Sequence, residues 1–291
     1  MTNTPILIGG AAGVTGNIAA KLLLEKGFPV RALVRSDDER AQKLKALGAE
    51  IFAADLLDFR ALRLAFKGIK RAYFVYPMRP GLVEATANFA QAASEAGVEF
   101  IVNMSQRTAR ADARSNSALA HWLAERLLDR SGVPVAHLHP TIFHEWLLYM
   151  RKGISKGRYA VPFGTTGKFA SVSALDQGHV IAALLAAPEG RAGQTYDLFG
   201  PEELTTLQIA EIVGRTLGKP VQYAQVSGEQ WIKDIRDADV EIPFLAQHIN
   251  AIAQQQQDGE MAGTNNVIEW ITGRKPESIA EFVERNRSAW Q

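Results

Sequence analysis

The sequence predicts an α/β protein built on a doubly wound parallel sheet, with a smaller, mostly helical carboxy-terminal substrate lobe. Three observations favour this class. Helical segments and short strands alternate through the first half of the chain, the strands are apolar throughout, and a glycine-rich turn follows the first strand. Alternation of this kind indicates right-handed crossovers between parallel strands.

The amino-terminal half repeats one sequence pattern, in which a helical segment is followed by a glycine and then by a strand. Gly27, Gly48, Gly97 and Gly132 each stand where a helix needs a left-handed residue after its last turn. Strands without polar alternation are typical of a sheet that helices cover on both faces. We therefore expect strands at Ile6–Ile8, Val30–Val34, Ile51–Ala53, Ala72–Val75, Phe100–Met104 and Val135–Leu138.

The regular alternation of helices and strands ends after Pro140. TIFHEWLLYM predicts an amphipathic helix, GRYAVPFGTTGKFASVS a loop or hairpin, DQGHVIAALLAAP a helix and GQTYDLFG a strand that returns to the main sheet. Thr205 with Gln208 and Ser278 with Glu281 form capping boxes that open two later helices. We read Gln254–Gln257 as the polar face of a helix. The predicted division is a nucleotide-binding domain over 1–141, to which 170–200 returns, and a lobe formed by 142–169 and 201–291.

Composition excludes several classes of protein. The net charge is +1, so no global field favours nucleic acid or an anionic membrane, and the absence of cysteine removes disulfides and thiolate chemistry. No apolar stretch approaches the roughly 20 residues of a membrane helix, and the first apolar run meets glycines at once instead of forming a signal peptide. We expect a cytoplasmic protein with a small-molecule acceptor, no direct nucleic-acid contact and no membrane contact. Whether it forms a homodimer stays open.

The strongest motif is PILIGGAAGVTGNIAAKLLLEKG, in which Gly10, Gly13 and Gly16 have the spacing G-x-x-G-x-x-G between a strand and a helix. Glycine lets the backbone turn tightly and approach a pyrophosphate, and the helix amino terminus offers free N–H groups to that phosphate. The motif predicts a Rossmann-type site for a nicotinamide dinucleotide. Its predicted members are Gly10, Ala12, Gly13, Val14, Thr15 and Gly16.

The end of the second strand should decide which dinucleotide binds. NAD enzymes usually carry an acidic residue there, whereas arginine accommodates the 2′-phosphate of NADP. Here the strand ends with Arg35 and Ser36, so we expect NADP(H); Arg31 lies too early on the strand. Asp55, after the third strand, suits a contact to adenine or a loop cap. Further cofactor contacts are expected after the fourth strand, at Tyr76, Pro77 and Met78.

With these residues in place, the chain resembles the NmrA-like branch of the atypical short-chain dehydrogenase/reductases over most of its length. The resemblance rests on GGAAGVTG, the ALVR strand end, ADLLD and AERLLDRSGVPVAHLHPTIFHEWL. It implies a Rossmann domain, a small substrate lobe and NADP(H) preference. Some members reduce quinones, azo dyes or triphenylmethane dyes, while others bind the dinucleotide without known turnover and act as redox sensors through protein partners.

The catalytic pattern departs from ordinary short-chain dehydrogenases. The positions of their Tyr-x-x-x-Lys pair hold His121 and Glu125, and the family's arginine before the proline is replaced by His139. Ser105 matches the usual catalytic serine. His121 and Glu125, four residues apart, share one helix face, so Glu125 is expected to raise the pKa of His121 and make it a proton donor. Packing of the histidine with a solvated glutamate is the alternative.

Three weaker features remain. Trp122 and the candidate substrate residues Phe143, Trp146 and Tyr149 could wall an aromatic pocket, although core packing explains them equally well. A metal site at His137, His139 and His144 lacks a set of carboxylates, and we expect none. Arg107, Arg110 and Arg114 suit an anionic substrate or a solvated loop.

Two functions follow from these expectations. The first is an NADPH-dependent oxidoreductase that transfers hydride to a flat conjugated acceptor such as a quinone, an azo compound or a related carbonyl. The alternative is a non-catalytic NADP(H)-binding redox sensor that regulates a partner protein.

Overall fold

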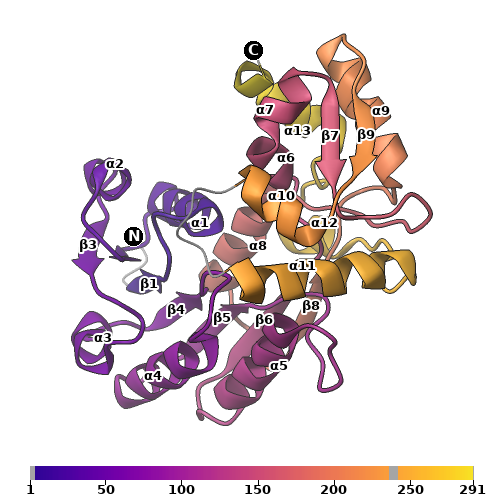
Figure 1. Cartoon of the computed structure of the whole chain (residues 1–291). Helices are drawn as coiled ribbons and strands as arrows, with labels where there is room; N and C mark the ends of the chain where they lie inside the picture. The colour runs from indigo at the N-terminus through magenta and orange to yellow at the C-terminus, as the bar shows by residue number, and fades with distance from the viewer. Residues whose placement is uncertain (1–3, 236–241, 291) are drawn as a thin grey trace.

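A computed structural model describes residues 4–235 and 242–290. Its main sheet has seven parallel strands in the order β3-β2-β1-β4-β5-β6-β8 (Figure 1). The chain order reverses between β1 and β4, which creates the crevice where doubly wound sheets bind ligands. The strands are β1 (Ile6–Ile8), β2 (Val30–Val34), β3 (Glu50–Ala53), β4 (Arg71–Phe74), β5 (Phe100–Met104), β6 (Val135–Pro140) and β8 (Thr195–Leu198).

Helices cover both faces of this sheet, which confirms the predicted fold class. Apolar side chains of one face pack with α1, α2, α8 and α12, and those of the other face pack with α3, α4 and α5. The first group comprises α1 (Val14–Glu25), α2 (Glu39–Ala46), α8 (Ala174–Ala186) and α12 (Val267–Thr272). The second comprises α3 (Phe59–Ala65), α4 (Leu82–Glu95) and α5 (Asn116–Asp129).

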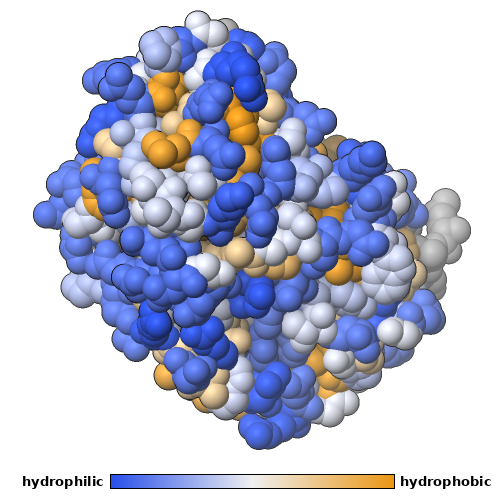
Figure 2. Space-filling view, turned by 90° about the vertical axis from the view of Figure 1, so that its right-hand side faces the viewer, coloured by the Kyte–Doolittle hydropathy of each residue, from blue (hydrophilic) through white to orange (hydrophobic). Residues whose placement is uncertain are grey.

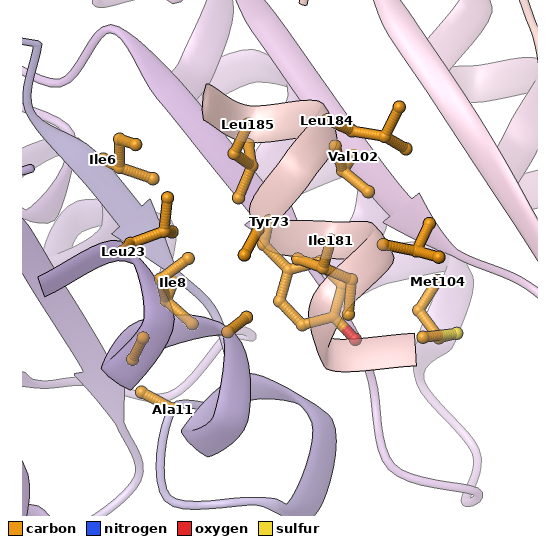
Figure 3. Packing of buried hydrophobic residues seen from close by; sticks show 14 of the residues in the cluster. Ile6, Ile8, Ala11, Leu23, Tyr73, Val102, Met104, Ile181, Leu184 and Leu185 are labelled. Carbon is orange, nitrogen blue, oxygen red and sulfur yellow. The ribbon is translucent and has the colours of Figure 1, made fainter. Parts of the chain in front are cut away.

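Tyr73 of β4 lies at the centre of the first face. Figure 3 shows its ring between the sheet and α8, near Ile181 and Met104, and the side chain is fully buried. Its hydroxyl is paired with Thr15 of α1 at 2.9 Å. A buried hydroxyl without a partner would cost about 1–3 kcal/mol, so this bond holds the first turn of α1 against β4.

The lobe has a second apolar core and lies beside the sheet (Figure 1). Its two strands, β7 (Arg158–Val161) and β9 (Gln222–Gln225), pair in parallel. The helical elements are α6 (Trp146–Tyr149), α7 (Arg151–Ser155), α9 (Thr206–Leu217), α10 (Gly228–Ile235), α11 (Ile242–Gln257), α13 (Ile279–Arg285) and the 3₁₀ turn Arg287–Trp290. In Figure 1, α11 crosses between the lobe and α5, and these two helices are in contact.

Local sequence signals identified the caps correctly. Gly27, Gly48, Gly97 and Gly132 all have positive φ angles. Both capping boxes form, with the side chains of Thr205 and Ser278 accepting hydrogen bonds from the third helical residue. Strand β8 joins β6 at the edge of the main sheet, as expected for the segment GQTYDLFG.

Several expectations for the second half were wrong. In GRYAVPFGTTGKFASVS the expected loop follows β7, but the alternative of a hairpin was wrong, because the partner of β7 is the distant β9. The predicted helix in TIFHEWLLYM is only the short α6. Ile268 of α12 belongs to the core of the main sheet, although 201–291 was assigned to the lobe. Gln254–Gln257 do end a helix, α11, and Gln254 and Gln257 are exposed as expected, but Gln255 and Gln256 are fully buried. Gln256 donates a hydrogen bond to the carbonyl of Gly167.

The surface also bears on the choice of partners. On the face in Figure 2, hydrophobic side chains form small separate groups among polar ones. None of the helices in the described part of the chain combines the length and apolarity needed to cross a membrane.

Candidate functional site

The glycine-rich turn between β1 and α1 has the geometry of a phosphate cradle. Gly10 has φ of 58°, in the left-handed region that favours glycine. A Cβ on Gly16 would lie 2.5 Å from the carbonyl oxygen of Gly10, and a Cβ on Gly13 would lie 3.0 Å from the same atom. The turn and the helix therefore pack too closely for any side chain at position 16. Gly13 precedes α1, whose first-turn N–H groups point toward the turn.

A cavity of about 400 Å³ opens beside this turn, at the carboxyl ends of β1 to β4. Ten of the twelve predicted cofactor residues line it: Gly10, Ala12, Gly13, Val14, Thr15, Arg35, Ser36, Asp55, Tyr76 and Pro77. The other two lie elsewhere, since Gly16 packs beneath the turn and Met78 lines a second cavity. Residues that the sequence reasoning missed include Leu33, Asp38, Arg40, Leu56 and Arg79.

Two arginines, Arg35 and Arg40, line the cavity after the end of β2. Arg35 is exposed at the cavity wall, next to Ser36. Asp38 caps α2 and forms an ion pair with Arg40, with 2.6 Å between Oδ2 and Nη2, and this pair lowers the pKa of Asp38. Of the charged residues of this segment that line the cavity, Arg40 pairs with Asp38, and Arg35 adds a second guanidinium to the wall. Arg31 points away and pairs with Glu50 at 2.8 Å.

Asp55 has the expected role of a loop cap. Its Oδ1 accepts a hydrogen bond from the backbone N–H of Leu57 at 2.9 Å, so it caps the loop after β3. It also lines the dinucleotide cavity. The loop after β4 is held by a hydrogen bond that the Tyr76 hydroxyl donates to the carbonyl of Pro80, at 3.1 Å.

A second cavity of about 640 Å³ adjoins the first, and the two share Pro77 and Arg79 in their walls. Its lining is mostly apolar and comes from the loop after β4 and from α4, α5 and α11, with Met78, Leu82, Ala120 and Phe244 among its residues. His121 and Ser117 line the α5 side. The arrangement places an apolar chamber directly beside the dinucleotide cavity, with an imidazole in its wall.

Glu125 acts on His121 in the expected direction, but the expectation that the pKa of His121 is raised overall, so that it becomes a proton donor, was wrong. Burial lowers the pKa of His121 to about 4; the Glu125 carboxylate opposes this shift, while His139 adds to it. Desolvation wins because α11 packs over this part of α5 and brings His248 close. His248 is bonded to Ser115 at 2.7 Å, and burial also lowers its pKa, to about 3. His121 is therefore neutral at pH 7.

Glu125 instead belongs to a buried network. Its Oε1 accepts hydrogen bonds from the Ser105 hydroxyl and from Nε2 of His139, the latter at 2.7 Å. Nδ1 of His139 faces Oδ1 of Asp197 at 3.6 Å. Ser105 follows β5, His139 lies on β6 and Asp197 on β8, so the network links three strands through α5. The structure thus joins Ser105 to Glu125 but not to His121.

The other two histidines of the considered metal site, His137 and His144, lie in different surroundings. His137 contacts Asn103 and Asp129, at 2.9 and 3.0 Å. His144 is buried against Phe282. Within the described ranges, no three histidine or acidic side chains group in a way that could hold a metal ion.

The candidate substrate aromatics and the arginine cluster have structural roles. Trp146 packs against Phe163 and Trp231, and with Phe143 it lines a lobe cavity of only about 20 Å³. Tyr149 is exposed and lies outside the second cavity. The three arginines form ion pairs: Arg107 with Asp197, Arg110 with Glu260, and Arg114 with Asp258 and Glu260. Arg110 and Arg114 therefore dock the end of α11 onto the loop after β5.

This combination of sheet order, phosphate cradle and cavity defines a Rossmann-type dinucleotide-binding protein. The sequence profile of the NmrA-like family matches residues 2–285, and the chain belongs to that family. It is 30% identical to the NAD(P)H azoreductase of Xenophilus azovorans over 288 residues, which cover 98% of this chain and 99% of that protein.

Solved structures agree with this placement. The fold matches the NADPH complex of an Escherichia coli NADPH-dependent quinone oxidoreductase with a TM-score of 0.83 and 25% identity, covering 97% of this chain and 99% of that one. It also matches a Citrobacter triphenylmethane reductase complexed with NADP(H), with a TM-score of 0.81 and 25% identity over 96% and 99% of the two chains.

Proposed function

We propose that the protein is an NADPH-dependent reductase that transfers hydride to a flat conjugated acceptor, such as a quinone, an azo compound or a related carbonyl. The observation that carries the proposal is the meeting of the two cavities at Pro77 and Arg79. One has a phosphate cradle and arginines in its wall, and the other is a largely apolar chamber. The reductases of quinones, azo compounds and triphenylmethane dyes among the relatives support the same acceptor class.

The chain's own residues fit the cofactor. Gly10, Gly13 and the first turn of α1 would hold the pyrophosphate, because the backbone there can approach without a Cβ. Arg35 and Ser36 would hold the 2′-phosphate, and Asp55 would contact the adenosine. Bound NADPH would supply a hydride equivalent, and the protein would contribute proximity and a dry chamber.

Proton delivery limits the acceptor class. His121 is neutral at pH 7, so its imidazole offers one N–H as a hydrogen-bond donor but holds no excess proton to give away. Quinones and azo compounds give stabilised anions after reduction, and water can protonate them. A simple ketone gives a strongly basic alkoxide that needs a positioned acid. The site therefore suits conjugated acceptors better than simple carbonyls.

The test is NADPH oxidation by the purified protein with a naphthoquinone, a soluble azo dye and an aliphatic ketone. We expect turnover with the first two and much slower turnover with the ketone. The matched control is Gly13→Asp, which places a Cβ and a negative charge against the pyrophosphate and should abolish both binding and turnover. Tight NADPH binding without oxidation by any of the three acceptors would contradict the proposal.

A further inference from the structure

One arginine, Arg79, lies where the two cavities meet. It belongs to the loop between β4 and α4, and its side chain is partly buried. Of the charged residues that line either cavity in the described part of the chain, it alone lines both. A ligand in the second cavity and a dinucleotide in the first would therefore both lie next to this cation.

The guanidinium of Arg79 has no anionic partner among the described residues. Its Nε is buried from water, and no hydrogen-bond acceptor contacts that atom within 4–235 and 242–290. None of the ion pairs in these ranges includes Arg79, whereas Arg40, in the wall of the first cavity, pairs with Asp38 at 2.6 Å. A buried N–H of a charged group that lacks an acceptor costs free energy, and a bound anion would recover it.

The loop holds this side chain in place without a ligand. The guanidinium carbon of Arg79 lies 5.3 Å from the centre of the Tyr76 ring, in a cation–π contact. Tyr76 is itself bonded to the carbonyl of Pro80, and the backbone N–H of Arg79 donates to the carbonyl of Pro77 at 2.8 Å. Gly81 ends the loop with φ of 103°, and a Cβ there would lie 2.6 Å from the Tyr76 hydroxyl. A guanidinium fixed in this way loses little freedom when it binds an anion.

The anions of a dinucleotide have other partners in the first cavity. The glycine-rich turn and the first turn of α1 are the proposed cradle of the pyrophosphate, and Arg35 stands where the 2′-phosphate is expected. Among the described residues that line the second cavity, one other side chain is ionised at pH 7, that of Glu84. Glu84 is exposed and lies in the first turn of α4, where a carboxylate complements the helix dipole. Arg79 is thus the cation that remains for a ligand of the second cavity.

We propose that Arg79 determines specificity for acceptors that carry an acidic group. A sulfonate or carboxylate on the conjugated ring system binds the guanidinium, while the rings fill the apolar second cavity. Apolar contacts alone leave a flat molecule free to slide, and one ionic contact at the junction fixes the rings beside the dinucleotide. The planar guanidinium can form two parallel hydrogen bonds to such a group. The inference rests on the proposed function for the ring system of the acceptor, and the anion site rests on the contacts of Arg79.

The experiment measures the binding of two probes to the NADP⁺-saturated protein by calorimetry. Naphthalene-2-sulfonate and naphthalene-2-sulfonamide have the same rings and nearly the same size, but only the first is an anion at pH 7. Arg79→Gln removes the cation, and Arg79→Lys keeps the charge without the planar fork. Arg130→Gln is the matched control, because Arg130 is an exposed arginine that lines neither cavity. The affinity for NADPH is measured for each variant.

The wild type should bind the sulfonate about tenfold more tightly than the sulfonamide, the value of one charge-assisted hydrogen bond at a partly exposed site. Arg79→Gln should lose this preference and keep its affinity for the sulfonamide and for NADPH. Arg79→Lys should keep part of the preference and Arg130→Gln all of it. Because the guanidinium and the sulfonate both stay ionised, the preference should be constant between about pH 6 and 8. In turnover, Arg79→Gln should raise the KM of a naphthoquinone sulfonate about tenfold and leave that of unsubstituted naphthoquinone unchanged.

Equal affinity of the wild type for the two probes would overturn the inference, as would a preference that survives in Arg79→Gln. A loss of NADPH affinity of about tenfold in Arg79→Gln would assign the side chain to a phosphate of the dinucleotide, and would overturn it as well. The calorimetry requires no turnover. A protein that meets the binding expectations but oxidises no NADPH with any acceptor would contradict the proposed function and leave the anion site intact.

Discussion

The close packing of α1 on the glycine-rich turn gives the sharpest structural prediction, for Gly16→Ala. The added Cβ would lie 2.5 Å from the Gly10 carbonyl oxygen, 2.9 Å from its carbon and 3.0 Å from the Gly9 oxygen. All three are backbone atoms, so no flexible side chain can swing away. The turn has to move by at least about 0.5 Å to reach the shortest contact that real Cβ atoms make. Overpacking of this kind costs about 1–3 kcal/mol of folding stability.

The control lies at the other end of the same helix. Gly27→Ala adds a Cβ into open space, but its φ of 79° penalises alanine by about 1–2 kcal/mol. The two variants should therefore lose similar stability in urea titrations. Only Gly16→Ala displaces the phosphate cradle, so only this variant should lose NADPH affinity in calorimetry, by about tenfold or more. Equal NADPH affinity in both variants would refute the placement of the pyrophosphate at this turn.

Three further predictions concern charge. Arg35→Met should weaken NADPH binding about ten- to a hundredfold and NADH binding little. The control Arg31→Met should not change the ratio of NADPH affinity to NADH affinity. Equal losses of affinity for both cofactors in Arg35→Met would place the 2′-phosphate elsewhere. His121→Phe should leave the rate of quinone reduction within about threefold of wild type between pH 6 and 8, because a group with a pKa of about 4 holds no excess proton there. A drop of about a hundredfold in this rate would show that His121 acts as a general acid. Burial raises the pKa of the Glu145 carboxyl from its unfolded value of 4.5 to about 7. The free energy of unfolding of the protein should therefore fall as pH rises from 4.5 through 7, because this carboxyl ionises more readily in the unfolded chain. Glu145→Gln should then be more stable than wild type at pH 8, by about 1–3 kcal/mol in urea titration, and equal to it near pH 4; no difference at pH 8 would contradict the buried charge.

Much of the main sheet was predictable because its signals are local. Strands β2, β3, β5 and β6 each follow a glycine with positive φ that ends the preceding helix. For the six strands expected from these signals, the observed boundaries differ by two residues at most. Most residues that line the first cavity were predictable for the same reason, since they follow the ends of successive strands. A glycine-rich turn and the residue after β2 need no knowledge of the rest of the chain.

The surroundings of His121 depend on contacts that no local pattern reports. Helix α11 packs across α5 more than a hundred residues later in the chain and brings His248 and Phe244 to this site. That burial reversed the expected direction of the His121 pKa. The hydrogen-bond partners of Glu125 likewise come from β6 and from the end of β5. The spacing of four residues between His121 and Glu125 on α5 gave no information about these contacts with the strands. Parallel β7 and β9 were missed because their pairing spans about sixty residues.

The account's central claim is that NADPH bound at the glycine-rich turn reduces an acceptor held in the neighbouring apolar cavity. Its most direct test is an anaerobic single-turnover experiment, in which the NADPH-loaded protein is mixed with one equivalent of naphthoquinone and the nicotinamide absorbance is followed. The account predicts stoichiometric loss of NADPH that slows when the transferable hydrogen of the nicotinamide is replaced by deuterium. Bound NADPH that stays reduced in the presence of naphthoquinone, or that is oxidised no faster than free NADPH, would contradict it.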